Sequence, residues 1–285
     1  MKTGLVLEGG GMRGLFTMGI LDVWMERGLR FDGAVGVSAG AAFGCNYKSG
    51  QIGRGIRYNV RYAGDWRYKS YRSLFVTGDI FGAEFCYHTL PEQLDKFDGE
   101  AFAANPMEFY AVATDVEKGI PVYKNLMKGD EADMQFIRAS ASLPIVSRVV
   151  PYGKRKLLDG GIADSIPLKF MEGRGYEQNV VVLTQPEDYV KEPTNLLPLA
   201  KVRLREYPKM IQCMAERHIM YNKQTAYVKK RVEEGKAFAI YPKEPLNISN
   251  MEKSGEELMR VYCLGRKAAE ETWDDLMTFL ANNRE

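Results

Sequence analysis

Short apolar runs alternate with longer amphipathic segments along most of the chain. The runs at residues 3–7, 32–37, 108–114 and 179–184 have the length and composition of buried strands. Between the first two, residues 14–27 place apolar side chains at helical spacing. A strand, a helix and a second strand in so short a stretch predict a crossover with parallel pairing. We therefore expect an α/β fold.

The remaining pattern continues the alternation of helices and strands. Helices are expected at residues 39–48, 52–63, 133–142, about 206–234 and from about 254 to the C-terminus, and strands at 121–125, 156–158 and 237–241. No Pro-, Gly- or Ser-rich linker and no repeat divides the chain. We expect residues 1–285 to form a single domain, with core motifs in 4–170 and a helical C-terminal part at about 190–285.

Composition excludes several classes of function. The 39 basic and 37 acidic residues nearly cancel, which argues against a nucleic-acid partner. The four cysteines lie far apart and there are only two histidines, so we expect no metal site and free thiols. No secretory apolar core is apparent, and no run approaches the roughly 18 apolar residues of a membrane span. The expected location is the cytoplasm, with peripheral contact to a membrane as an option.

The second predicted strand runs directly into GVSAG, at residues 36–40. This G-x-S-x-G pattern between a strand and a helix is typical of a nucleophile elbow. Gly36 and Gly40 would let the strand and helix approach each other, and the sharp turn would expose the hydroxyl of Ser38 above the sheet. Ser38 is therefore a candidate nucleophile.

A glycine-rich loop follows the first predicted strand. Gly9, Gly11 and Gly14 fit G-x-G-x-x-G, which predicts a loop that binds the pyrophosphate of a dinucleotide. The same bare amides, in particular those of Gly10 and Gly11, would also form an oxyanion hole. The first interpretation predicts an oxidoreductase and the second a hydrolase.

The end of the second strand favours the hydrolase. A dinucleotide-binding fold places an acidic residue there, to hold the ribose hydroxyls. Here Ser38 occupies that end, while Asp32 lies at the beginning of the strand, on the wrong edge of the sheet. The turns that follow two adjacent parallel strands lie side by side, so the glycine loop would face Ser38.

A serine nucleophile requires a base, and the sequence offers two kinds. His218 follows the candidate aspartates, as in a Ser-Asp-His triad, but lies in a long polar helical segment; His88 precedes them. Asp159 instead ends a short apolar strand and is followed by Gly160 and Gly161. An ordinary D-G-G turn is the alternative, but the end of a strand is where sites assemble in such sheets. We favour Asp159.

Four blocks in this order resemble the patatin-like phospholipase family: GGGMRG at 9–14, GVSAG at 36–40, ASASLP at 139–144 and DGG at 159–161. The resemblance covers about the first 170 residues, and the order is more specific than any single block. It implies a three-layer α/β/α fold with a mostly parallel central sheet. It also implies a serine esterase of the phospholipase or lysophospholipase type, which hydrolyses acyl esters of lipids with a Ser-Asp dyad.

Carried over by position, the resemblance makes Ser38 the nucleophile and Asp159 the general base. Asp159 is then expected in a water-poor pocket that raises its pKa. No metal or cofactor is implied. A dinucleotide-binding oxidoreductase and a catalytically silent scaffold remain the alternatives. The oxyanion loop comprises Gly9, Gly10, Gly11, Met12, Arg13 and Gly14, with Arg13 bracing it.

Residues 54–72 combine six basic side chains with five aromatic ones and a single acid, Asp65. Such a segment either seats the protein on anionic lipid or forms an amphipathic helix and loop with inward aromatics and solvated cations. We favour the second interpretation, because charged runs are usually solvated faces.

Overall fold

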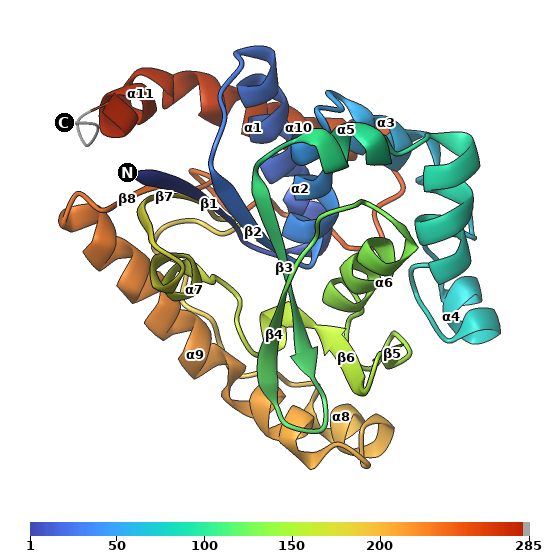
Figure 1. Cartoon of the computed structure of the whole chain (residues 1–285). Coiled ribbons are helices and arrows are strands. Elements are labelled where there is room, and N and C mark those ends of the chain that lie inside the picture. The colour runs from blue at the N-terminus through green and yellow to red at the C-terminus, as the bar shows by residue number, and fades with distance from the viewer. Residues whose placement is uncertain (282–285) are drawn as a thin grey trace.

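The computed structural model describes residues 1–281. Their strands form one sheet in the order β5-β6-β3-β2-β1-β7-β8, with β4 paired to β3 (Figure 1). The strands are β1 (Lys2–Leu7), β2 (Gly33–Val37), β3 (Glu108–Asp115), β4 (Ile120–Asn125), β5 (Val150–Tyr152), β6 (Arg155–Asp159), β7 (Tyr176–Val182) and β8 (Ala237–Ile240). All strands expected from the sequence are confirmed, and β5 is added.

Helices separate and follow these strands. They are α1 (Gly14–Glu26), α2 (Ala39–Ser49), α3 (Arg54–Arg61), α4 (Tyr71–Thr77), α5 (Gly99–Ala104), α6 (Glu131–Ser140), α7 (Leu168–Gly173), α8 (Leu197–Arg203), α9 (Pro208–Glu233), α10 (Gly255–Glu271) and α11 (Trp273–Ala281). Short 3-10 turns at Gly11–Arg13 and Gly160–Ile162 and a π-helical segment at Phe85–Leu94 complete the elements.

The sheet is parallel at its centre and antiparallel at one side. Strands β3, β2, β1, β7 and β8 run parallel to one another, as the crossover pattern predicts. Strands β4 and β6 both run antiparallel to β3, and β5 is antiparallel to β6. The chain therefore forms a mixed, mostly parallel sheet.

Helices cover both faces of the sheet, because alternate strand residues point to opposite sides. Leu5 and Leu7 belong to one core, shared with α1, α2, α6 and α10. Val6, between them, belongs to the other core, shared with α7 and α9. These two apolar interfaces produce the three-layer α/β/α arrangement seen in Figure 1.

One expectation about the helices is corrected, and several short helices are added. The helix expected from 254 to the C-terminus ends at Glu271, and a separate helix starts at Trp273. The break lets Leu276 and Leu280 reach the core while Trp273 packs against Arg27, with the guanidinium 4.6 Å from the ring centre. The short helices α4, α5, α7 and α8 lack a long periodic pattern and were not predicted.

Residues 54–72 follow the favoured interpretation only in part. Tyr58, Tyr62 and Tyr68 are buried as expected, whereas Trp66 and Tyr71 are exposed. Arg54 and Lys69 are also buried, whereas solvated cations were expected. Arg54 donates hydrogen bonds to the Asn46 side chain and to a backbone carbonyl, which offset the loss of water.

Among residues 1–281, no helix combines the length and apolar character needed to cross a bilayer.

Candidate active site

Ser38 follows strand β2, and Asp159 is the last residue of strand β6. These two strands meet end to end along β3. Strand β2 pairs with β3 up to Val37, opposite Val112, and β6 ends at Asp159, opposite Ala113. Because β6 is antiparallel to β3, it reaches Ser38 from beyond the end of β2. Asp159 is the last residue of its strand, as expected, but that strand runs antiparallel to β3, which the sequence did not indicate.

Ser38 occupies a strained turn between β2 and α2. Its backbone has φ 54° and ψ −119°, a region that non-glycine residues rarely adopt. A Cβ atom on Gly36 would lie 2.5 Å from the carbonyl oxygen of Gly40, and one on Gly40 would lie 2.4 Å from that of Leu7. Neither contact is tolerable, so the strand and helix require glycine at both positions.

Two serines of the ASASLP block fasten this arrangement. The hydroxyl of Ser140, at the end of α6, accepts a hydrogen bond from the Ser38 amide at 2.9 Å. The carbonyl of Ser142 accepts one from the Asp159 amide at 2.8 Å. The block is therefore the link that holds the serine turn and the aspartate in one frame, a role that its sequence alone did not reveal.

The Asp159 carboxyl is buried, with 3% of its surface exposed. Oδ1 accepts a hydrogen bond from the Gly161 amide at 2.8 Å, whereas Oδ2 has no hydrogen-bond partner within the described chain. Burial raises the pKa of Asp159, and the Ser38 hydroxyl, Arg217 and the Gly161 amide oppose that rise. One oxygen is thus fixed and the other is free to accept a proton.

The glycine loop lies against the serine turn. A Cβ atom on Gly9 would come within 2.9 Å of the Cβ of Ser38. Gly11 has φ +57°, a conformation that favours glycine. The amides of Gly10 and Gly11 make no hydrogen bond in the described part of the chain. They are two donors beside the serine, as an oxyanion hole requires.

Side chains from elsewhere hold this loop. The Met12 amide donates to Oδ1 of Asn250 at 3.2 Å, and the buried Nζ of Lys69 lies 3.3 Å from the Met12 sulfur. Arg13 extends across the loop, with Nη2 only 3.3 Å from where a Cβ of Gly10 would lie. Gly14 packs α1 against α2, where its Cβ would meet that of Ala39 at 2.8 Å.

The competing candidates lie elsewhere. Neither His88 nor His218 lines a cavity that contains Ser38. His88 lies 3.4 Å from a carboxylate oxygen of Glu92. Asp32, considered for a dinucleotide ribose, instead accepts hydrogen bonds from the amide and hydroxyl of Thr3 at 2.7 and 2.9 Å. It therefore joins β1 to the start of β2.

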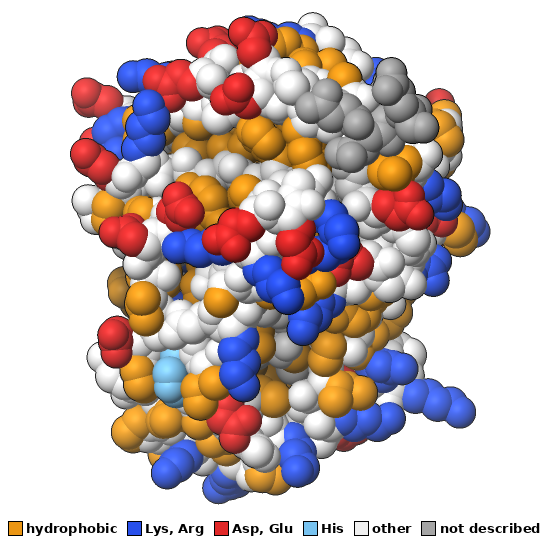
Figure 2. Space-filling model, turned by 90° about the vertical axis from the view of Figure 1, so that its left-hand side faces the viewer, with side chains coloured by type: hydrophobic (Ala, Val, Ile, Leu, Met, Phe, Trp, Pro, Cys, Tyr) orange, Lys and Arg blue, Asp and Glu red, His pale blue; other side chains and the backbone are white. Residues whose placement is uncertain are grey.

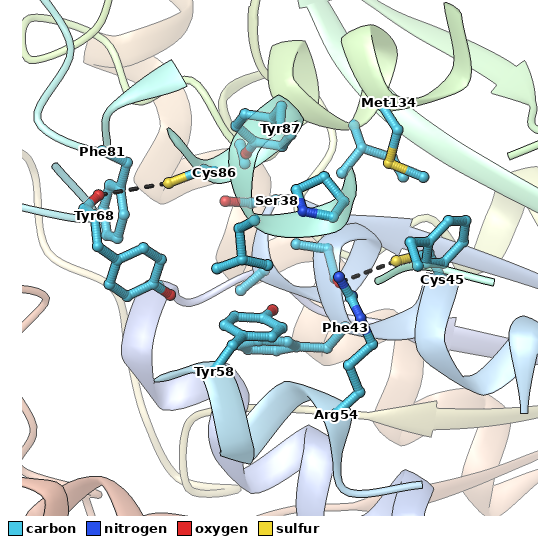
Figure 3. Close-up of a pocket in the computed structure, with 18 of the residues that line it drawn as sticks. Ser38, Phe43, Cys45, Arg54, Tyr58, Tyr68, Phe81, Cys86, Tyr87 and Met134 are labelled. Carbon is cyan, nitrogen blue, oxygen red and sulfur yellow. Dashed lines mark hydrogen bonds between the residues drawn. The ribbon is translucent and has the colours of Figure 1, made fainter. Parts of the chain in front are cut away.

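Two cavities meet at Ser38. The first is mainly apolar, has a volume of about 120 Å³, and is lined by Ser38 and by Met12 of the glycine loop, among others. Aromatic rings and sulfur atoms surround it, as Figure 3 shows. Its walls include Phe43, Tyr58, Tyr68, Phe81, Cys86, Tyr87 and Met134. Arg54 also lines it, so the surface of this cavity is mostly but not wholly apolar.

The second cavity, of about 200 Å³, is polar and contains both Ser38 and Asp159. Arg13, Lys191 and Arg217 also line it, and none of the three forms an ion pair within residues 1–281. Burial, together with repulsion from Arg217 and Arg13, lowers the pKa of Lys191 to about 8. The sequence analysis missed Lys191, Arg217 and Asn250, because no local motif marks them.

A mostly parallel sheet between helical layers, with a serine on a strained strand-to-helix turn, places the chain among α/β proteins built like serine hydrolases. The chain belongs to the patatin-like phospholipase family, which it matches over residues 5–171. Residues 207–281 match a second family, a domain of unknown function designated DUF6363. Lys191 lies outside both matches, and Arg217 lies inside the second.

Individual relatives extend over different shares of the chain. The uncharacterized protein YjjU of Escherichia coli is 27% identical over 274 residues, which cover 93% of this chain and 75% of that protein. Lysophospholipase nte1 of Aspergillus oryzae is 28% identical over 184 residues, 61% of this chain but 11% of that protein. Among solved structures, VipD from Legionella pneumophila matches with a TM-score of 0.47 and 14% identity, covering 96% of this chain and 67% of that one.

Proposed function

We propose that this protein is a lipid acyl hydrolase in which Ser38 is the nucleophile and Asp159 the general base. The observation that carries the proposal is the buried Asp159 carboxyl with its unpartnered Oδ2, held beside a serine on a strained turn. Membership of the patatin-like phospholipase family and similarity to lysophospholipases support a lipid substrate.

The reaction follows from these groups. The Ser38 hydroxyl attacks an ester carbonyl while its proton passes to Asp159. The amides of Gly10 and Gly11 donate hydrogen bonds to the oxyanion that forms. When the tetrahedral intermediate breaks down, the leaving alcohol takes the proton from Asp159 and an acyl-serine remains. Water then attacks the acyl-serine with Asp159 again as base, releasing the fatty acid and restoring Ser38.

The two cavities divide a lipid ester between them. The apolar cavity takes the acyl chain, and the polar cavity takes the leaving alcohol. Arg13, Lys191 and Arg217 outnumber the acids of the polar cavity, Glu8 and Asp159. The Glu8 carboxylate is already occupied by Tyr221 and Thr184. The unpaired cations favour a leaving group with negative charge, such as a phosphate.

We further propose that the chain folds as one domain. Strand β8 pairs with β7, and Asn250 binds the glycine loop near the N-terminus. Gly19 of α1 and Gly265 of α10 lie in close backbone contact: a Cβ on either would fall about 2 Å from the opposite helix. Segments from both ends of the chain thus share one core and one site.

A fluorophosphonate probe on the wild type and on Ser38→Ala tests the proposed function. We expect the wild type to be labelled and the variant not, because the probe reacts with an activated serine. Equal labelling of both proteins would refute the assignment of Ser38. Binding of NAD or FAD without labelling would favour the dinucleotide binder. The absence of both labelling and cofactor binding would favour a catalytically silent scaffold.

A further inference from the structure

Large apolar side chains are exposed on two short helices, α4 and α8. On α4, Phe75 is 93% exposed and Tyr71 is 73% exposed, with Val76 beside them. On α8 and the residue before it, the exposed set is Leu196, Leu199 and Val202, spaced three apart and therefore on one helical face. Exposure of these side chains to water is unfavourable, and each helix presents an apolar surface that nothing in residues 1–281 covers.

One segment, residues 143–149, connects the two helices. Its Val146 carbonyl accepts a hydrogen bond from the Ile80 amide, and its Arg148 amide donates to Asp79, just beyond α4. On its other side, Ile145 and Val149 pack in the cluster that contains Ala200 of α8. In Figure 1, α4 lies at the right-hand edge and α8 at the lower edge, with β5 between them. We call the exposed surface of residues 66–78, 143–149 and 195–205 the docking face.

The charge of the docking face is mainly positive, although Asp65 and Glu206 border it and Arg67 is paired with Asp65 at 2.7 Å. The three segments contain no Asp or Glu. Their exposed cations are Arg67, Arg72, Arg148, Lys201, Arg203 and Arg205. The face shown in Figure 2 differs, because acidic and basic side chains are mixed there. Aromatic and aliphatic side chains among cations are the combination that inserts into the interface of an anionic bilayer.

The docking face adjoins the walls of both cavities. Tyr68 and Phe81, which flank α4, form part of the wall of the apolar cavity, and Leu143 lines both cavities. An acyl chain that leaves a bilayer beneath α4 would therefore meet the wall of the apolar cavity first.

We propose that the docking face binds the surface of a lipid bilayer that contains anionic lipid. Phe75, Val76 and Val202 enter the interfacial layer, and the surrounding arginines and lysines contact the lipid headgroups. The use of this contact, to bring lipid to Ser38, rests on the proposed function, but the binding itself does not require the serine.

Co-sedimentation of the full chain with vesicles tests the proposal. The wild type should bind vesicles of phosphatidylcholine with phosphatidylglycerol, and bind less to pure phosphatidylcholine or at high salt. Phe75→Ser with Val76→Ser should weaken binding to the anionic vesicles roughly tenfold or more, because two large apolar contacts are lost. Leu199→Ser with Val202→Ser should weaken it in the same direction.

Matched controls separate this proposal from the proposed function. Met259→Ser with Met277→Ser removes two apolar side chains, each 40% exposed, from α10 and α11, and should bind vesicles like the wild type. Ser38→Ala should also bind normally, and the α4 variant should keep wild-type turnover of a soluble short-chain ester. Wild-type binding by the α4 variant, or no binding by the wild type, would overturn the proposal. Self-association of the wild type that the α4 variant abolishes would instead identify a second copy as the occupant.

Discussion

Oδ1 of Asn250 accepts a hydrogen bond from the Met12 amide at 3.2 Å, across 238 residues of sequence. The same oxygen lies only 2.0 Å from the position that a Cβ on Gly11 would take. A residue from the C-terminal part of the chain therefore fixes the glycine loop, while the amides of Gly10 and Gly11 make no hydrogen bond within residues 1–281.

Gly11→Ala should lower turnover of a short p-nitrophenyl ester by about a hundredfold to a thousandfold, the usual cost of one oxyanion donor. The added methyl group collides with Asn250 and is strained at φ +57°. Asn250→Gly in the Gly11→Ala background should restore part of the rate, since it removes the collision but not the strain. Gly10→Ala, whose Cβ would meet Thr184 Oγ1 at 2.6 Å, should also be slow. Normal turnover in folded Gly10→Ala and Gly11→Ala variants would show that the loop does not take part in the reaction.

Asp159→Asn should reduce turnover by about 10²- to 10⁴-fold, because the amide cannot accept the serine proton. His88→Ala, His218→Ala and the double variant should keep most of the activity, as neither ring lines a cavity with Ser38. Steady-state kinetics with a soluble ester measures all four. A folded His218→Ala protein with negligible turnover would instead establish a histidine base.

The pH dependence should report the raised pKa of Asp159. Turnover should rise with pH through a carboxyl pKa above the usual 3.8, because the base acts only when ionised. Stability changes in the opposite sense: the contribution of this carboxyl is complete below its unfolded pKa and is lost as pH rises through the folded one. Asp159→Asn, which cannot ionise, should therefore melt at a higher temperature than the wild type near pH 8, with little difference at about pH 4. An equal difference at both pH values would contradict this linkage.

Lys191→Met should impair substrates with an anionic leaving group. For a monoacylglycerol phosphate, KM should rise roughly tenfold through loss of a charged hydrogen bond, while the uncharged monoacylglycerol of the same chain length should be unaffected. The preference of the wild type for the phosphate should fade above about pH 8, as Lys191 loses its proton. Lys223→Met is the control, since Lys223 lies on α9 outside the polar cavity. Equal effects on both substrates would show that Lys191 does not recognise the negative charge of the leaving group.

Chelation should leave the activity unchanged, because the proposed oxyanion donors are backbone amides. Turnover of a short ester should be the same with and without EDTA after extensive dialysis. A loss that calcium restores would contradict the proposed mechanism.

The sequence by itself determined what depends on neighbouring residues. The strand, turn and helix around Ser38 follow from GVSAG, since the need for small residues at 36 and 40 arises within a few residues of the serine. The parallel pairing of β1 and β2 follows from the short crossover between them. The glycine loop and DGG turn were located in the same way, because each motif carries its own backbone requirement.

The tertiary structure decided which distant residues share a site. Asp159 reaches Ser38 because β6 turns antiparallel and meets β2 end to end, a direction that no local pattern specifies. Lys191, Arg217 and Asn250 reach the same cavity through the packing of the C-terminal segments. The exposure of Phe75 could not be predicted from the sequence either. A seven-residue helix has too little periodicity to show which face it buries, so its packing against neighbouring elements decides this.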